Sequence, residues 1–265
     1  MAISRLKAIA AELKQEKETE VAMKVARKRQ LSMLPATPSI PGYDFHTKYL
    51  PASKVSGDFY EFIPVSDSAI GIAMGDVTGH GVEAGLVMGM AMAAIGIMGT
   101  GVESPKDILA AVNNYLAPKL DGETFFSASY GILDFHLHTF RFARAGHNPP
   151  ILYNPRRNPA LTQLSPPGMV IGVDKTGKRF PKIMEEITIQ LAAGDLFVQY
   201  TDGVTEAPNK RKEEYGEDRL MQIVARNYSL DIANFLTAIE EDVLTFCGDH
   251  EQEDDITLIG FRVHG

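Results

Sequence analysis

The feature that most constrains this chain is an abrupt change in composition at three prolines within residues 35–41. Residues 3–34 contain neither glycine nor proline and are rich in Ala, Lys, Glu and Leu, which favour helices. Proline interrupts a helix because it lacks the amide hydrogen that the helix needs. We therefore expect an N-terminal helix over residues 1–34 and a separate domain over residues 35–265.

The charge and the apolar pattern of this arm allow two roles. Residues 1–34 carry eight basic and four acidic side chains, a charge of +4, which leaves −12 for the rest of a chain whose net charge is −8. The apolar residues begin with heptad-like spacing, which then fails, and they resume in another phase at Val21 and Val25. The arm is either a solvated helix with a short docked end or a connecting helix that pairs with a dimer mate or an upstream sensor.

Beyond residue 42 the pattern changes to short segments in which apolar residues recur at every second position, as in strands. The expected strands cover residues 43–50, 58–65, 69–76, 125–134, 139–145, 151–153 and 256–263, and the expected helices cover 84–102, 105–116, 218–227 and 230–246. We also expect a hairpin of residues 187–191 and 195–200, and a loop over residues 154–182. This order is typical of an α+β fold with helices on antiparallel sheets.

One expected helix, over residues 84–102, is uncharged and as long as a membrane span. We reject a membrane span because the segment contains five glycines, owes its hydrophobicity mostly to Ala and Met, and has no flanking Lys or Arg. A buried helix packed closely on a sheet explains the composition better. The N-terminus does not resemble a signal peptide, so the cytoplasm is the expected compartment.

The composition disfavours two classes of function. The single cysteine, Cys247, forbids an intramolecular disulfide and a thiolate metal cluster. The acidic domain disfavours a nucleic-acid binder, which needs a cationic surface to face phosphates. The same acidity is compatible with a protein that binds divalent cations.

Several aspartates stand where an expected strand meets a turn. Asp58 lies in SGDFY, Asp76 in MGDVTGHG, Asp202 in YTDGVTE, and Asp254 and Asp255 in EDDIT. A single Asp-Gly is most often an ordinary turn, but four such sites at strand ends can converge on one cleft. Clustered carboxylates repel one another unless a cation lies between them, and Mg²⁺ and Mn²⁺ prefer such oxygen ligands. The residues by themselves predict a divalent-metal site, with phosphoryl hydrolysis as a candidate reaction.

The segments GDFYEF, GDVTGHG, AGHNPP, YTDGVTEA and EDDITL, in this order and spacing, resemble the metal-dependent serine/threonine phosphatases of the type 2C (PPM) superfamily. The chain looks most like the bacterial SpoIIE/RsbU branch, from about residue 35 to the C-terminus. The resemblance implies a four-layer α-β-β-α sandwich of two antiparallel sheets flanked by helices. It also implies two Mn²⁺ or Mg²⁺ ions in a cleft at one end of the sandwich.

The resemblance assigns roles to individual residues. It implies that Asp58, Asp76 and Asp202 are catalytic, that Asp76 bridges the two ions, and that a metal-bridging water attacks phosphorus without a phosphoenzyme. The implied metal ligands all lie at strand ends: Asp58, Asp76, Val77 through its backbone carbonyl, Asp202, Asp254 and the adjacent alternative Asp255.

The chain departs from the pattern of the eukaryotic relatives at several positions. Those relatives place a histidine two residues after the bridging aspartate, where this chain has Thr78, and His80 follows two residues later. They also hold the phosphate with an arginine, for which Lys54 is a weak substitute here. The general acid is therefore unassigned, and we interpret His147 and Asn148 of AGHNPP as residues that shape a turn.

The resemblance implies a phosphatase that acts on phosphoserine or phosphothreonine in a protein. The implied substrate is an anti-sigma-factor antagonist of the STAS type in a partner-switching pathway. The basic helix would receive a signal and set the geometry of the cleft. One alternative is a non-catalytic module that keeps the fold and recruits a partner, which the complete set of aspartates disfavours. Another is a metal-dependent phosphodiesterase or nuclease, which the acidic domain disfavours.

Overall fold

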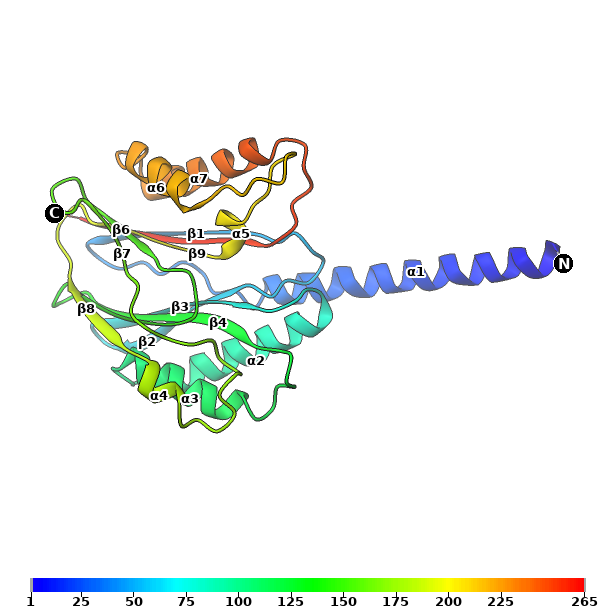
Figure 1. Ribbon diagram of the computed structural model, residues 1–265, viewed down its shortest axis with the longest axis horizontal. Coiled ribbons are helices and arrows are strands. Elements are labelled where there is room, and N and C mark those ends of the chain that lie inside the picture. The colour runs from blue at the N-terminus through cyan, green and yellow to red at the C-terminus, as the bar shows by residue number, and fades with distance from the viewer. Residues whose placement is uncertain (1, 265) are drawn as a thin grey trace.

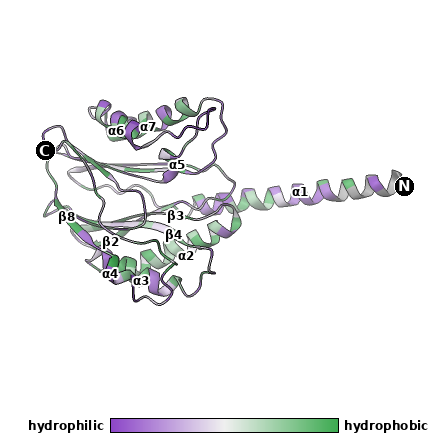
Figure 2. Cartoon of the chain, in the orientation of Figure 1, coloured by the Kyte–Doolittle hydropathy of each residue, from purple (hydrophilic) through white to green (hydrophobic). Residues whose placement is uncertain are grey.

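The computed structural model describes residues 2–264, and the predicted N-terminal helix is α1 (Ala2–Leu31). This helix of 30 residues projects from the rest of the molecule as a rod about 45 Å long (Figure 1). Figure 2 shows hydrophilic and hydrophobic residues mixed along it. Leu13, Val21 and Val25 each expose more than half of their surface. Residues 12–22 of α1 are all exposed, and the helix reaches the domain at its C-terminal end, where Gln30 is buried.

The first of two sheets joins strands that lie far apart in the sequence. In spatial order its five antiparallel strands are β1 (Tyr43–Leu50), β10 (Ile256–Val263), β9 (Leu196–Tyr200), β6 (Ile151–Tyr153) and β7 (Leu161–Gln163). Tyr43 lies opposite Val263 and Leu50 opposite Ile256. The first and last strands of the domain are thus paired along their whole length.

The second sheet is built mainly from sequential neighbours. In spatial order its five strands are β2 (Phe59–Ser66), β3 (Ala69–Val77), β4 (Phe126–Asp134), β5 (Thr139–Ala145) and β8 (Glu186–Gln190). All of its pairs are antiparallel. Its central strands are almost fully buried, because the other sheet covers one face and helices cover the other.

Helices cover the outer faces of both sheets (Figure 1). The second sheet carries α2 (Val82–Gly99), α3 (Pro105–Leu116) and α4 (Phe180–Ile183), and the first carries α6 (Glu217–Arg226) and α7 (Ile232–Cys247). A single turn, α5 (Asp202–Thr205), follows β9. The predicted α+β sandwich with an N-terminal helix is confirmed.

The space between the sheets is filled by aromatic side chains. On β9, Phe197 faces the other sheet, whereas its neighbours Leu196 and Val198 face the covering helices, as the alternation of a strand requires. The ring of Phe197 stacks on Phe261 at 4.7 Å and meets the edge of Phe140 at 5.0 Å. Phe140 belongs to the second sheet, so these contacts join the two layers.

The apolar helix α2 is the one helix within residues 2–264 that is long and apolar enough to cross a membrane. It lies on the second sheet, and its own residues Met88, Ala91 and Ile95 are buried. A Cβ atom at Gly99 would come within 2.6 Å of the Tyr130 hydroxyl oxygen. Small residues are therefore needed where this helix meets the sheet, as its composition predicts.

The predicted hairpin of residues 187–191 and 195–200 is wrong. The two strands exist, but β8 pairs with β5 in the second sheet, and β9 pairs with β10 and β6 in the first. Residues 191–195 instead carry the chain from one sheet to the other. The predicted loop over residues 154–182 is also partly wrong, because it contains β7 and the start of α4. A strand of three residues such as β7 is too short to show the apolar alternation from which a strand is predicted.

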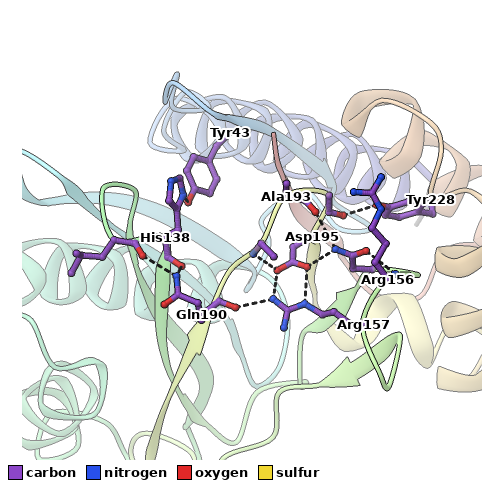
Figure 3. Close-up of polar contacts among 12 residues, drawn as sticks. Tyr43, His138, Arg156, Arg157, Gln190, Ala193, Asp195 and Tyr228 are labelled. Carbon is purple, nitrogen blue, oxygen red and sulfur yellow. Dashed lines mark hydrogen bonds and ion pairs between the residues drawn. The ribbon is translucent and has the colours of Figure 1, made fainter. Parts of the chain in front are cut away.

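The crossover at residues 191–195 is held by an ion pair between the buried Asp195 and the half-buried Arg157 (Figure 3). Asp195 is fully buried, and its Oδ1 accepts hydrogen bonds from Arg157 Nε at 2.7 Å and Asn154 Nδ2 at 2.8 Å. Its Oδ2 accepts from the amide of Ala192 at 2.8 Å and from Arg157 Nη2. Arg157 Nη2 also donates to the carbonyl of Gln190 at 2.8 Å, so the arginine ties both sheets together.

Candidate metal centre

The predicted aspartates come together at the end of the sandwich from which α1 projects (Figure 1). In the β2–β3 pair, Phe59 lies opposite Gly75, so Asp58 and Asp76 are brought to the same edge. In the β9–β10 pair, Leu258 lies opposite Tyr200, so the segments that hold Asp202 and Asp254 also meet there. Antiparallel pairing gathers two aspartate segments within each sheet, and the packing of the two sheets brings the two pairs together.

The glycines beside these aspartates allow the backbones to approach. A Cβ atom at Gly57 would lie 2.7 Å from the carbonyl oxygen of Val77 and 3.3 Å from Oδ1 of Asp76. At Gly203, which follows Asp202, a Cβ atom would lie 2.0 Å from the carbonyl oxygen of Asp255. The Gly-Asp and Asp-Gly motifs are thus packing requirements, and they bring the Val77 carbonyl to the same place as the carboxylates.

Asp58 is the most enclosed of the carboxylates, with 1% of its surface exposed. One of its oxygens, Oδ2, accepts a hydrogen bond from the hydroxyl of Thr201 at 2.8 Å and another from the hydroxyl of Thr257. Thr257 lies in β10 and Thr201 directly follows β9, so the carboxylate of Asp58 is held from the side of the first sheet. Both threonines were missed at the level of sequence, although each lies within two residues of a predicted ligand.

The electrostatics of the cluster are those of uncompensated negative charge. Burial, the charge of Asp202 and that of Asp254 together raise the pKa of Asp76 to about 8, although Asp58 lies within hydrogen-bonding reach and partly opposes the rise. Burial and the neighbouring Asp76 also raise the pKa of Asp58 well above its usual range. The pKa values of Asp202 and Asp254 are raised chiefly by burial, and each by a nearby acid.

This donor set fits hard divalent cations, because carboxylate oxygens that repel one another are stabilised by a cation between them. As the side chains lie, no group of three or more His, Cys, Asp or Glu residues between positions 2 and 264 is already arranged to hold an ion. The cluster therefore offers ligands of suitable chemistry from several strand ends, without three of them placed around one point.

Asp254 and Asp255, which sequence could not separate, have different surroundings. Asp255 is buried, and its two oxygens accept hydrogen bonds from the amides of Ala52 at 2.7 Å and Gly57 at 3.3 Å. Asp254 is exposed as a whole residue, although neighbouring atoms partly desolvate its carboxyl group. It lies near Asp202 and His80, whose charges shift its pKa in opposite directions. Asp255 is thus occupied in anchoring the loop before Asp58, whereas Asp254 faces the cluster.

The three residues at which the chain departs from the eukaryotic pattern, Thr78, His80 and Lys54, lie in different surroundings. Thr78 is engaged with the backbone of Phe125, donating to its carbonyl at 2.8 Å and accepting from its amide at 3.2 Å. His80 is exposed on the side of Asp254. Lys54 is exposed and helps Lys24 to lower the pKa of Glu20 on α1. Lys54 therefore lies toward the helical arm.

Gln30, which sequence reasoning missed, joins the arm to the loop of residues 51–58 between β1 and β2, called the metal-centre loop below. Gln30, in the last turn of α1, is 7% exposed. Its amide nitrogen donates to the carbonyl of Ser56 at 2.7 Å, and its amide oxygen accepts from the amide of Ser56 at 2.9 Å. The hydroxyl of Ser56 accepts from the amide of Asp58 at 3.0 Å. A short chain of hydrogen bonds therefore links α1 to Asp58.

A cavity of about 360 Å³ adjoins the cluster. Gly203 and Asp254 line it on the side of the carboxylates, and Leu244 and Cys247 of α7 line it on the other. It gives the site an open approach with a partly apolar wall.

Comparisons with known proteins agree with this geometry. A family model described as Stage II sporulation protein E (SpoIIE) matches residues 66–264. The phosphoserine phosphatase RsbU of Bacillus subtilis (strain 168) is 29% identical over 253 residues, which cover 94% of this chain and 72% of RsbU.

Solved structures show the same fold. The SiaA-PP2C domain of Pseudomonas aeruginosa has a TM-score of 0.79 at 22% identity, covering 94% of this chain and 98% of that one. The structure of RsbX in complex with magnesium has a TM-score of 0.62 at 16% identity, covering 86% of this chain and 98% of RsbX. Magnesium is thus bound by one protein of this fold.

Proposed function

Because the chain belongs to the SpoIIE family of PP2C-like serine phosphatases, we propose that it is a metal-dependent phosphatase that hydrolyses phosphoserine or phosphothreonine in a protein. The observation that carries the proposal is the gathering of Asp58, Asp76, Asp202 and Asp254 at one edge, with every pKa raised. A protein keeps such repulsion at a cost, and sites with perturbed carboxylates are candidates for function.

In this proposal the metal ligands are Asp58, Asp76, Asp202, Asp254 and the carbonyl oxygen of Val77. Asp255 is assigned the positioning of the loop, since both of its oxygens accept backbone hydrogen bonds. Two Mn²⁺ or Mg²⁺ ions would supply an activated water and neutralise charge on the phosphate. The magnesium in RsbX supports this choice of metal.

The chain's own residues prepare the site. Thr201 and Thr257 hold one oxygen of Asp58, which leaves its other oxygen available as a ligand. Asp58, Asp76 and Asp202 are the proposed catalytic residues. His80 is exposed beside Asp254, where it can meet a substrate, and the general acid is not assigned.

We further propose a phosphorylated anti-sigma-factor antagonist of the STAS type as the substrate, in a cytoplasmic partner-switching pathway. The similarity to RsbU, named a phosphoserine phosphatase, supports a phosphoprotein substrate. The cavity of about 360 Å³ beside Asp254 provides room for side chains of such a substrate.

The helical arm is the proposed route of regulation. Its exposed Leu13, Val21 and Val25 are apolar side chains that a dimer mate or an upstream sensor could cover. Movement of α1 would be passed through Gln30 and Ser56 to the loop that holds Asp58. The arm would thereby bias the cleft between less and more active arrangements.

The proposed activity is tested with the full chain, p-nitrophenyl phosphate and a phosphoserine protein, in Mn²⁺ and in chelator. Asp76→Asn is the test variant, and Asp67→Asn, an exposed aspartate in the β2–β3 turn, is the matched control. We expect activity in Mn²⁺ that chelator and Asp76→Asn abolish and Asp67→Asn preserves. Metal binding without turnover on any phosphoprotein would instead favour a non-catalytic binding module.

A further inference from the structure

The AGHNPP turn that follows β5 makes contacts that the proposed function does not use. His147 is 1% exposed, and its Nδ1 lies 2.7 Å from the hydroxyl oxygen of Ser127. Ser127 lies directly opposite Asp76 in the pairing of β3 with β4. Residues directly opposite on antiparallel strands point to the same face, with Cβ atoms about 4.5–5.5 Å apart. The side chains of Ser127 and Asp76 therefore project side by side from the same face of the sheet.

The turn is fastened to both sheets. Arg144 of β5 donates from Nη1 to the carbonyl of His147 at 2.7 Å. Gln199 of β9 donates from Nε2 to the carbonyl of Asn148 at 2.9 Å. At Gly146, φ is +74° and a Cβ atom would meet Val170 Cγ1 at 2.4 Å. The imidazole is thus fixed in place between the sheet that carries Asp76 and the sheet that leads to Asp202.

The surroundings of His147 do not suit proton transfer. Burial and the nearby charge of Arg144 lower its pKa to about 3, and the backbone of Tyr200, which lies nearby without the geometry of a hydrogen bond, only weakly opposes them. Its Nε2 is buried and makes no hydrogen bond within the described part of the chain. The contact with Ser127 is thus its one side-chain hydrogen bond there, and a fixed neutral ring is suited to holding a neighbouring hydroxyl.

We propose that His147 and Ser127 form a positioning pair, in which Nδ1–H of the neutral His147 donates to the Ser127 hydroxyl oxygen and the hydroxyl proton is left to donate to the carboxylate of Asp76, which it orients toward the divalent ions. The inference rests on the proposed function, because it takes Asp76 as a metal ligand. Residues that orient metal ligands in this way commonly change metal affinity or activity by about 10–100-fold when they are replaced.

The test measures the dissociation constant of Mn²⁺ by calorimetry on the full chain, a readout that requires no turnover. Ser127→Ala is expected to weaken Mn²⁺ binding by about tenfold, and Ser127→Thr, which keeps the hydroxyl, is expected to restore most of it. Ser129→Ala is the matched control, since Ser129 lies on the same strand and face but opposite Met74. It should bind Mn²⁺ like the parent.

His147→Gln gives the second arm of the test. If the two residues act as one unit, His147→Gln should weaken Mn²⁺ binding about as much as Ser127→Ala, and the double variant no more than either. Circular dichroism establishes that each variant is folded, and Ser127→Ala decides the matter if His147→Gln does not fold.

Equal Mn²⁺ affinity of Ser127→Ala and the parent would overturn the inference and leave His147 as a residue that only shapes the turn. A parent that binds Mn²⁺ but hydrolyses no phosphoester would overturn the proposed activity, while the ranking of the variants would still decide the role of Ser127. A parent that binds no Mn²⁺ would overturn both.

Discussion

Two buried aspartates lie at opposite ends of the same sandwich, and the protein treats them differently. Asp195, at the end away from α1, is fully buried between the guanidinium of Arg157, an asparagine amide and a backbone amide. Asp58, at the other end, is equally buried, but its charged neighbour is another aspartate, Asp76. Burying a charge is costly unless it is paired. The arrangement around Asp195 fixes the connection between the two sheets, and the arrangement around Asp58 is suited to binding a cation.

Two of the segments that cross between the sheets repeat this contrast. The crossover at residues 191–195 is fixed by a charged pair, whereas the one at 146–150 is fixed by the neutral His147 and by hydrogen bonds from Arg144 and Gln199 to backbone carbonyls. A neutral group beside the acidic cluster adds no fixed charge of its own. The geometry there can be set without compensating the aspartates.

The largest expected difference between the two ends is in activity. Asp58→Asn removes a proposed metal ligand, so kcat/KM for p-nitrophenyl phosphate in Mn²⁺ should fall at least about a hundredfold, as expected for losing several kcal/mol of metal-dependent stabilisation. Asp195→Asn, the same chemical change at the other end, should retain near-parent kcat/KM when assayed well below its melting temperature. Equal losses in both variants would contradict the assignment of function to one end.

The second largest expected effect is on the free energy of unfolding, at the end of the sandwich that holds the Arg157–Asp195 ion pair. Arg157→Met leaves the carboxylate of Asp195 buried without its partner, which should lower the free energy of unfolding by about 3–5 kcal/mol. Arg211→Met breaks the exposed pair with Glu213 and should change it by less than about 1 kcal/mol. Urea unfolding in chelator measures both. A loss at Arg157 no larger than that at Arg211 would show that the ion pair does not hold the crossover.

A smaller effect is expected where α1 meets the metal-centre loop. Gln30→Ala leaves the buried backbone amide and carbonyl of Ser56 without their side-chain partners, which should cost about 1–3 kcal/mol. Gln15→Ala, on the exposed part of α1, should have no measurable effect. The proposed coupling also requires a change in kcat for Gln30→Ala. Reduced stability with unchanged kcat would limit Gln30 to docking the helix.

The smallest effect concerns a third carboxylate, Asp174, which is compensated by hydrogen bonds alone. The amide of Phe180, the hydroxyl of Thr176 and the amide of Arg179 lower its pKa to about 2 from 3.8, although burial opposes them. This stabilisation is present above pH 3.8 and is lost as the pH falls toward 2. Asp174→Asn should therefore have a lower melting temperature than the parent at pH 7, and the difference between the two melting temperatures should become smaller as the pH is lowered to 2. A constant difference from pH 7 to pH 2 would contradict this.

Much of the fold followed from local pattern. The strands over 43–50 and 256–263, and the helix capped by Ser104, lie where alternation, glycine and proline placed them, and Ser104 accepts its capping hydrogen bond from Asp107 at 3.3 Å. The hairpin failed because alternation tells which residues are buried but does not tell which strand is the partner. The aspartates were found because each sits at the end of an expected strand, and Asp58, Asp76 and Asp202 also sit beside a glycine.

The sequence by itself determined the elements, the family and the acidic character of one edge, because these are written in composition, periodicity and short motifs. Only the tertiary structure decided how the acids are held. Thr201 and Thr257 reach Asp58 across 143 and 199 residues of sequence, and Ser127 meets Asp76 through strand pairing. The tertiary structure also distinguished Asp255, whose oxygens accept backbone hydrogen bonds, from its exposed neighbour Asp254. Such contacts depend on which strands lie side by side, and that is settled only when the two sheets pack.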